Sequence, residues 1–481
     1  MSCRASVMKM RPHAHGRLPA LDTPLPSVRT VAKIDFLDDH WLECRRGLRR
    51  AYSQAFKSPA NPVVRPTEQW EENRIYLFGS VLPAGNSGYR MWYQTCSDRL
   101  RGPDKALVCV ADSHDLVSWR KQINGFLPFR DQKKTNIVLK CSGPAPLYSP
   151  SIIFDERETD PAKRFKMLFW DSGRPNERRG GCVAFSPNGL RWRRHASNPV
   201  FCNPNDVLVT SLDPDGGYLC YQTLLVEDTS QDHPRDNLRG RRRIIGLRTS
   251  GDFVNWSESK PILSPDDSDP ADAQFYGMAV HREGDLWIGL LWTYRAGSQT
   301  SDVQLAWSRD GRRWQRPRER RPLIPLGDPR QFDCGLIFTA SSPVELDGRI
   351  HILYGGFDGP HDSRTRSAAI GLASLRRDGW CALAAGDEWG ELTTTPLPFP
   401  PQTLRLNIDA SSGCCAGEII DVESGAPLPG CSLHDSIPIQ DMNSLAARLR
   451  WQSTPHPSPE PGAWALRLRL RNANLYAVKA P

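Results

Sequence analysis

Apolar and polar residues alternate along this chain in short runs that predict β-strands and no long helix. Between residues 75 and 373, runs rich in β-branched and aromatic residues come in groups of three, bounded by Gly, Pro, Asn and Asp. The first strands of the groups are expected at Ile75–Leu82, Ser151–Phe154, Val207–Leu212, Phe275–Val280 and Gly335–Ala340. The second strands are expected at Tyr89–Tyr93, Phe165–Trp170, Tyr218–Thr223, Leu286–Tyr294 and Ile350–Tyr354. The third strands are expected at Ala106–Ala111, Gly181–Phe185, Ile244–Arg248, Val303–Trp307 and Ala368–Ala373.

Each third strand runs into a turn that the chain repeats. The copies are Ser113–Trp119, Ser186–Trp192, Ser250–Trp256, Ser308–Trp314 and a shortened Arg377–Trp380. Asp or Asn followed by Gly sets a tight turn, Ser caps the amides of the turn, and Trp begins a fourth strand with a large packing surface. Four antiparallel strands repeated five times predict a five-bladed β-propeller.

The remaining segments divide the chain further. Residues 1–30 are expected to be a disordered tail, residues 31–388 the catalytic propeller, and residues 389–481 a C-terminal β-sandwich. Short strands near Ile34 and Trp41 are candidates to help close the ring. In the last segment, Leu466, Leu468 and Leu470 alternate with three arginines, which is typical of a half-buried strand in an antiparallel sandwich. The fold class is therefore all-β.

Composition and charge limit the classes of molecule that we expect the protein to bind. The 481 residues carry a formal net charge of +8, with arginine clusters at Arg239–Arg243 and Arg312–Arg321 that we interpret as solvated outer loops. The alternative, a basic patch for an anionic partner, stays open. Because no nucleic-acid motif accompanies these clusters and no apolar run approaches the ~20 residues of a membrane span, we expect neither nucleic acid nor membrane as a partner. The oligomeric state stays open.

The cysteines and the N-terminal sequence both give evidence on the cellular compartment of the protein. Thirteen cysteines form no regular framework and have no metal-ligand spacing, so we expect mostly free, buried thiols, no metal site and no cofactor. The first residues lack the apolar run of a signal peptide. Both observations favour a cytoplasmic protein.

Propeller geometry brings the residues that lead into the five inner strands to one face. These leading segments are Trp70-Glu71-Glu72, Tyr148-Ser149-Pro150, Asn205-Asp206, Ala273-Gln274-Phe275 and Phe332-Asp333. Carboxylates from different blades with aromatic and amide neighbours suit glycoside hydrolysis, in which one carboxyl protonates the leaving oxygen and a second attacks the sugar or activates water. We predict Glu71, Asp206 and Asp333 as the catalytic residues, with Glu72 a rival of Glu71.

Further residues on the same face are candidates for binding a carbohydrate substrate. They are Glu72, Asp171, Gln274, Tyr276, Trp292, Arg295, Asp358 and His361. Each candidate also has a plainer interpretation. An Asp that precedes a strand often only caps a turn, an aromatic residue in a strand is usually core, and Arg295 can simply balance Asp358.

The turns, the propeller and the C-terminal sandwich together resemble the five-bladed glycosidases of glycoside hydrolase families 32, 43 and 68, and family 32 in particular. The turns Ser113–Trp119 and Ser250–Trp256 carry this resemblance. The chain is also similar to a group of uncharacterised bacterial family 32-like proteins through Gln274–Met278, Phe332–Leu336 and Gly355–His361.

The catalytic motifs of family 32 are replaced in this chain. Trp70-Glu71-Glu72 stands where its Trp-x-Asn-Asp-Pro-Asn-Gly motif is expected, Tyr148-Ser149-Pro150 replaces its Arg-Asp-Pro motif, and Asn205-Asp206 stands at its Glu-Cys motif. The resemblance implies a glycoside hydrolase without implying its sugar. A non-catalytic glycan-binding propeller and a phosphate-dependent phosphorylase, using Arg295 among its basic residues, are the alternatives.

Overall fold

A computed structural model describes residues 33–480 of the chain, apart from residues 98, 101, 124, 142–145, 172–178, 204 and 453–459. The tail predicted for residues 1–30 lies outside the described residues. Among them, one compact unit comprises residues 55–344 and 351–374, and a second comprises residues 33–54, 345–350 and 375–480. Both units are built from β-strands, with only short 3-10 helices at Gly85–Ser87, Gly102–Asp104, Pro161–Lys163, Thr229–Gln231 and Pro401–Thr403.

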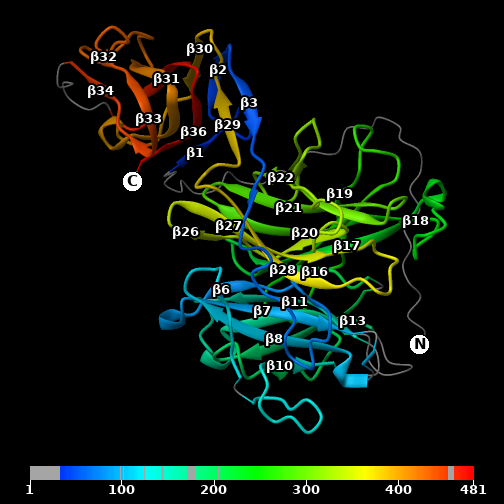
Figure 1. The fold of residues 1–481 in the computed structure, drawn as a ribbon. Helices are drawn as coiled ribbons and strands as arrows, with labels where there is room; N and C mark the ends of the chain where they lie inside the picture. Colours follow the sequence, from blue (N-terminus) through cyan, green and yellow to red (C-terminus); the bar gives the residue numbers. More distant parts are fainter. Residues whose placement is uncertain are drawn as a thin grey trace. The chain divides into compact units, whose positions relative to one another are not determined.

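Within the described residues, the first unit consists of antiparallel groups of strands that we number as meanders one to five (Figure 1). Meander one contains β5 (Ile75–Tyr76), β6 (Val81–Pro83), β7 (Tyr89–Cys96), β8 (Ala106–Ser113), β9 (Arg120–Lys121) and β10 (Ile137–Lys140). Meander two contains β11 (Leu147–Phe154), β12 (Phe165–Asp171), β13 (Gly180–Ser186), β14 (Arg193–Arg194) and β15 (Phe201–Cys202). Meander three contains β16 (Leu208–Leu212), β17 (Tyr218–Glu227), β18 (Arg241–Ser250) and β19 (Lys260–Leu263).

Meanders four and five are joined by one parallel pair, Ser301 with Leu336. Meander four contains β20 (Ala273–Glu283), β21 (Leu286–Arg295), β22 (Thr300–Ser308), β23 (Trp314–Gln315) and β24 (Pro322–Ile324). Meander five contains β25 (Leu336–Thr339), β26 (Val344–Leu346), β27 (Arg349–Phe357), β28 (Ala368–Arg376) and the N-terminal strand β4 (Phe56–Lys57). The predicted groups of strands are all present. The first strand of meander one is interrupted, because Gly79 approaches the Trp92 carbonyl so closely that a Cβ there would lie 1.9 Å from the oxygen.

Hydrogen bonds from the first or second strands, or from residues beside them, link consecutive meanders and return from the last to the first. In order, they join Ser80 Oγ to the Ile152 amide (2.8 Å), Ser151 Oγ to Thr210 Oγ1 (2.9 Å), Thr223 Oγ1 to the Tyr276 carbonyl (2.5 Å), Trp292 Nε1 to Thr339 Oγ1 (3.1 Å) and Ser341 Oγ to Ser80 Oγ (2.6 Å). Three apolar clusters of the first unit lie between neighbouring meanders, namely one and two, two and three, and three and four. One cluster packs Trp92 and Val110 against Ile152 and Phe169.

Four of the repeated turns have the predicted geometry. In the first, Ser113 Oγ accepts the Leu116 amide (2.9 Å) and Asp115 Oδ1 accepts the Ser118 amide (2.7 Å). Trp119 then donates its indole N–H to the Leu116 carbonyl (2.9 Å). The fourth turn residue is left-handed in every copy, with φ of 63° at Leu116, 70° at Gly189, 67° at Phe253 and 68° at Gly311. Glycine suits this conformation, but the turn imposes it on Leu116 and Phe253 as well.

The fifth, shortened copy is different. Asp378 is buried in the second unit and forms ion pairs with Lys33 and Lys479. The strand after Trp380, β29 (Cys381–Ala384), pairs with β3 (Arg49–Tyr52) and β36 (Asn474–Lys479) in that unit. The expectation that each Trp leads into the fourth strand of its own group is therefore wrong here, because β4 takes that place beside β28.

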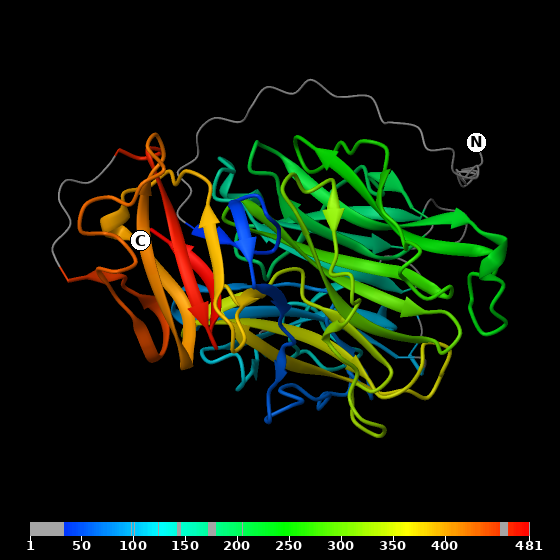
Figure 2. The ribbon, with the colours of Figure 1, turned by 90° about the horizontal axis from the view of Figure 1, so that it is seen from above.

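The second unit is built around the long strand β31 (Arg405–Asp421). It also contains β1 (Lys33–Asp35), β2 (Leu42–Arg46), β29, β3, β30 (Gly390–Thr394), β33 (Ile439–Ala447), β35 (Trp464–Arg471) and β36, beside the pair β32 (Ser436–Ile437) and β34 (Arg450–Trp451). Leu466, Leu468 and Leu470 are fully buried, as their alternation predicts. Strands from both ends of the chain, blue and red in Figure 2, share this unit, so it takes residues 33–54 and 375–388 that the sequence analysis assigned to the propeller.

Candidate functional site

Asp206, which leads into the inner strand β16, lies in a pocket with a cavity volume of about 350 Å³. We call it the Asp206 pocket. Every meander contributes to its wall, but only two of the five leading segments, through Tyr148 and through Asn205-Asp206, supply lining residues. The lining residues are Arg74, Tyr76, Phe78, Cys96, Tyr148, Asn205, Asp206, Asn237, Leu238, Arg243, Tyr276, Leu336, Phe338, Phe357, His361, Asp362, Ser363, Arg364 and Arg366.

The Asp206 carboxyl is half-buried and forms no ion pair with any described residue. Burial raises the pKa of this carboxyl above its ordinary value, and a hydrogen bond from its own backbone N–H and the charge of Arg243 only partly offset that effect. A carboxyl with a raised pKa keeps its proton at higher pH. Asp206 is therefore suited to donate a proton to a bound substrate.

A second carboxyl in the same pocket has the opposite environment. Asp362 is exposed, and its two oxygens accept hydrogen bonds from Nε and Nη2 of Arg235, each 2.8 Å long. These bonds hold the pKa of Asp362 below its ordinary value. Two carboxyls whose surroundings shift their pKa values in opposite directions are suited to act as an acid and a base.

Tyr276 and His361 form a polar pair on the wall of the pocket. The Tyr276 hydroxyl lies 3.0 Å from Nε2 of His361. Burial, together with the charges of Arg366 and Arg243, lowers the pKa of His361 to about 3. The imidazole is therefore neutral at physiological pH and takes part in this contact as a hydrogen-bonding group rather than as a charge.

Beneath this pair, Arg243 is held rigidly. Its guanidinium donates to both oxygens of Asp236, at 2.9 and 3.0 Å, and lies 5.5 Å from the ring centre of Tyr276. Gln274 is fully buried and accepts a hydrogen bond from Arg243. The predicted substrate-binding residue Gln274 thus supports Arg243, while Tyr276 and His361 line the pocket.

A loop, residues 358–367, forms the rim of the pocket, and two arginines hold it by hydrogen bonds to its backbone carbonyls. Arg366 donates to the carbonyls of Pro360 (3.0 Å), His361 and Ser363 (3.2 Å), and Arg74 donates to the carbonyls of Arg364 (3.4 Å) and Arg366 (3.1 Å). With Arg243 and Arg364, four arginines line a pocket that holds two aspartates. The pocket therefore carries an excess of positive charge.

The structure does not bring Glu71 to the Asp206 pocket. Its carboxylate is fully buried. It accepts the Tyr93 hydroxyl (2.5 Å), the Lys121 ammonium (2.5 Å) and the backbone amides of Thr67 and Glu68 (2.7 and 3.0 Å). A carboxylate with this many donors is a structural acceptor, so Glu71 ties the start of meander one to its outer strand β9.

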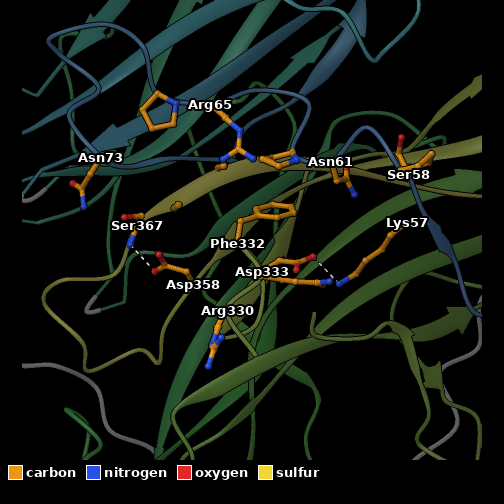
Figure 3. A pocket seen from close by; sticks show the side chains of 16 residues that line it. Lys57, Ser58, Asn61, Arg65, Asn73, Arg330, Phe332, Asp333, Asp358 and Ser367 are labelled. Carbon is orange, nitrogen blue, oxygen red and sulfur yellow. Dashed lines mark hydrogen bonds and ion pairs between the residues drawn. The ribbon is translucent and has the colours of Figure 1, made fainter. Parts of the chain in front are cut away.

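Asp333 lies in a different cavity and repeats the same arrangement (Figure 3). It is 1% exposed, and its Oδ2 accepts Lys57 Nζ (2.6 Å) and the Tyr354 hydroxyl (2.8 Å). Lys57 and Lys121 each stand on the outermost strand of their meander, opposite Ala373 and Ala111. Glu71 and Asp333, two of the three predicted catalytic acids, therefore each belong to an acid–lysine–tyrosine cluster. Each cluster connects the strands of one meander.

The remaining predicted binding residues lie outside the Asp206 pocket. Trp292 is fully buried and stacks on Phe78 at 5.4 Å, Asp171 is 2% exposed and pairs with Arg194 at 2.7 Å, and Glu72 pairs with Arg99 at 3.5 Å. Asp358 lines the cavity of Asp333 and accepts the Ser367 amide (2.7 Å). Arg295 lies near Asp302, whose pKa is raised to about 6 by burial.

Sequence reasoning missed Asp362 and Arg243. The motif that it singled out stops at His361, one residue before Asp362. Arg243 was grouped with the outer arginines of Arg239–Arg243, although it is 2% exposed and enters the apolar part of β18 beside Ile244 and Ile245. That apolar continuation is the signal that marks Arg243 as an inward-facing residue.

Three further features concern metal sites, thiols and membrane spans in the described part of the chain. There, no group of three or more His, Cys, Asp or Glu side chains is placed to hold a metal ion. The cysteines with described surroundings are free thiols, and most are buried. No helix among the described residues combines the length and the apolar character needed to cross a membrane.

No protein-family model and no curated protein matches the chain. Several solved structures are similar in fold. An N-acetylgalactosamine deacetylase from F. plautii in complex with blood group B trisaccharide is 13% identical, with a TM-score of 0.47 over 70% of this chain and 97% of that one. A thermostable family-43 glycoside hydrolase is 15% identical (TM-score 0.46, 68% and 95%), and β-1,2-mannobiose phosphorylase from Listeria innocua is 11% identical (0.45, 67% and 96%). Such distant similarity decides nothing about chemistry, which has to come from the pocket itself.

Proposed function

We propose that this protein is a glycosidase that cleaves glycosidic bonds in the Asp206 pocket. Asp206 acts as the general acid that protonates the leaving oxygen, and Asp362 acts as the base that activates the attacking water. The reaction needs one carboxyl that holds a proton and one that has lost it, at the same sugar. The opposite shifts of the two pKa values are the observation that carries this proposal.

The other residues that line the Asp206 pocket would bind the sugar substrate. Tyr276 and neutral His361 present hydroxyl and imidazole groups that can exchange hydrogen bonds with sugar hydroxyls, and Phe78 and Phe338 supply apolar surface for a sugar ring. Arg243, fixed by Asp236, keeps a positive charge under the pocket floor. In this proposal Gln274 positions Arg243 and does not touch the substrate.

The test is turnover on a panel of oligosaccharides and aryl glycosides. Asp206→Asn and Asp362→Asn should each lower kcat/KM at least about 100-fold, the scale of general acid or base catalysis. Asp131→Asn, at an exposed position outside the pocket, is the control and should keep wild-type activity. Full activity in both pocket variants would refute the proposal. Binding of a glycan without any product would instead indicate a carbohydrate-binding protein.

One observation favours a second candidate, phosphorolysis. Four arginines outnumber the two aspartates in the pocket, and Arg364 is exposed at its rim. Phosphorolysis needs only one general acid, because phosphate replaces the activated water. Under this candidate, turnover depends on inorganic phosphate and releases a sugar phosphate, and Arg364→Ala raises the KM for phosphate while Asp362→Asn stays active. Equal turnover with and without phosphate excludes it.

We also propose that the first unit is a five-bladed β-propeller and that the second is a β-sandwich. The closed circuit of hydrogen bonds from Ser80 through Thr210 and Thr339 back to Ser341 supports the blade count. The path of β31, which pairs with β36 along its first half and with β35 along its second, supports two packed sheets. Each meander is then one blade, with β4 closing the fifth.

A further inference from the structure

The cavity beside Asp333 has a volume of about 770 Å³, and the reaction proposed above does not use it. We call it the Asp333 pocket (Figure 3). Its size falls within the range of small-molecule sites. Its lining residues are Lys57, Ser58, Pro59, Asn61, Pro62, Arg65, Pro66, Asn73, Arg330, Gln331, Phe332, Asp333, Asp358, Ser367, Ala368 and Ala369.

The base of the pocket is rigid and electrically balanced. Lys57 is neutralised by Asp333 and lies 5.9 Å from the ring centre of Tyr354. Asn61 donates to the Tyr354 hydroxyl (3.1 Å) and accepts the Leu372 amide (2.8 Å). Asp333 Oδ1 accepts no hydrogen bond from any described residue, whereas both oxygens of the equivalent Glu71 are fully used.

The walls of the Asp333 pocket present hydrogen-bond donors and acceptors beside the aromatic ring of Phe332. Arg65 is exposed, and its side chain forms no ion pair with a described residue. Asp358 uses Oδ1 for the Ser367 amide and leaves Oδ2 without a partner among the described residues. Phe332 is half-buried and covers Tyr354, with ring centres 6.0 Å apart. Figure 3 shows Arg65, Phe332 and Asp358 around one hollow, while the Arg330 side chain points away from them.

These groups match a neutral polyhydroxylated ring better than an ion. Each sugar hydroxyl is both a donor and an acceptor, so it can satisfy a carboxylate acceptor and a guanidinium donor at once. The C–H face of a sugar can cover Phe332 and the neighbouring prolines. An anion would meet Asp358, and a cation would meet Arg65, so neither charge is favoured.

We propose that the Asp333 pocket is a second saccharide-binding site, for a neutral sugar ring, separate from the Asp206 pocket. The loop 358–367 forms the wall between the two. Asp358 and Ser367 face the Asp333 pocket, and His361 and Arg366 face the Asp206 pocket. The site requires no turnover, and it stands even if the chemistry proposed for Asp206 fails.

The experiment measures binding of mannose, glucose, galactose, xylose and inorganic phosphate, each at the same millimolar concentration, by saturation-transfer NMR and calorimetry. The full wild-type chain is used, because a free monosaccharide has no glycosidic bond for the enzyme to cleave. Arg65→Ala and Asp358→Asn should each weaken binding of a neutral sugar about tenfold to a hundredfold, because each removes a charged hydrogen-bonding partner. Asp358→Asn keeps an acceptor for the Ser367 amide. Arg193→Ala, at an exposed arginine outside both pockets, is the matched control.

Binding that Arg65→Ala and Asp358→Asn weaken, and that the control does not, supports the proposal. A crystal soaked with the same sugar should then show it beside Phe332. The proposal is overturned if no neutral sugar binds, if phosphate alone binds, or if the sugar occupies only the Asp206 pocket. Because catalysis is measured separately in the wild-type chain, loss of turnover and loss of this binding are independent results.

Discussion

The Asp206 pocket and the Asp333 pocket each contain an aspartate that stands just before the inner strand of a meander, yet the two carboxylates have different partners. Asp333 meets Lys57 from the outermost strand and Tyr354 from the second strand. In meander three the outermost strand begins with Lys260, which is exposed, and Asp206 is left unpaired among the described residues. Position alone thus places an acid before an inner strand, but the residue on the outer strand decides whether that acid is structural or chemically available.

The largest effect that tests this comparison is on stability. Glu71→Ala leaves the Lys121 ammonium and the Tyr93 hydroxyl without their acceptor, and Asp333→Ala does the same to Lys57 and Tyr354. Each should lower the free energy of unfolding by about 3 kcal/mol, the low end for a broken buried pair because the lysines are partly exposed. Urea denaturation measures it, with Asp131→Ala as the control. A loss under about 1 kcal/mol in both variants would remove the structural role.

A double variant tests the structural role of the ion pair between Glu71 and Lys121 more specifically. Replacing the pair by apolar side chains, Glu71→Leu with Lys121→Met, removes both charges together. The part of the loss that comes from the unpaired Lys121 charge should return, whereas the part that comes from the Tyr93 hydroxyl and the Thr67 amide should remain, because these donors still lack their acceptor. The measured quantity is the free energy of unfolding of the single and double variants. Additive losses would instead show that Glu71 and Lys121 act independently.

Asp206→Asn should behave in the opposite way and stabilise the fold. Because the pKa of Asp206 is raised in the folded state, the folded chain holds a proton that the unfolded chain has released, so wild-type stability falls as pH rises from about 4 through the folded-state pKa. The amide removes that loss. At neutral pH the gain should be about 0.5–2 kcal/mol. Thermal unfolding of both proteins across this pH range measures it, and a parallel pH dependence in the two would contradict the assignment.

The smallest effect concerns the partner of Asp362. Arg235→Ala removes the hydrogen bonds that lower the pKa of Asp362, so the acidic limb of the pH–rate profile should move to higher pH while the alkaline limb, set by Asp206, stays in place. Stability should change by no more than about 0.5 kcal/mol, since the pair is exposed. A shift of the alkaline limb alone would reverse the assigned roles.

The elements that the sequence predicts well are those built from neighbouring residues. Strands and turns such as Ser113–Trp119 depend on alternation, a serine cap and a left-handed residue within a few positions. The roles of Glu71 and Asp333 could not be predicted in the same way. Lys57 lies 276 residues from Asp333 along the chain, and nothing local shows that β4 crosses to β28. The positions of the acids before the inner strands were therefore foreseeable, but which of these acids lacks an ion-pair partner was not.

The most direct test of the account compares two amide variants on whichever glycan the wild-type protein cleaves. Asp206→Asn and Asp333→Asn are assayed for kcat/KM at equal concentrations of folded protein. Asp206→Asn should lose at least about 100-fold in kcat/KM, while Asp333→Asn should stay within a few-fold of wild type. An equal loss in both, or a loss only in Asp333→Asn, would contradict it.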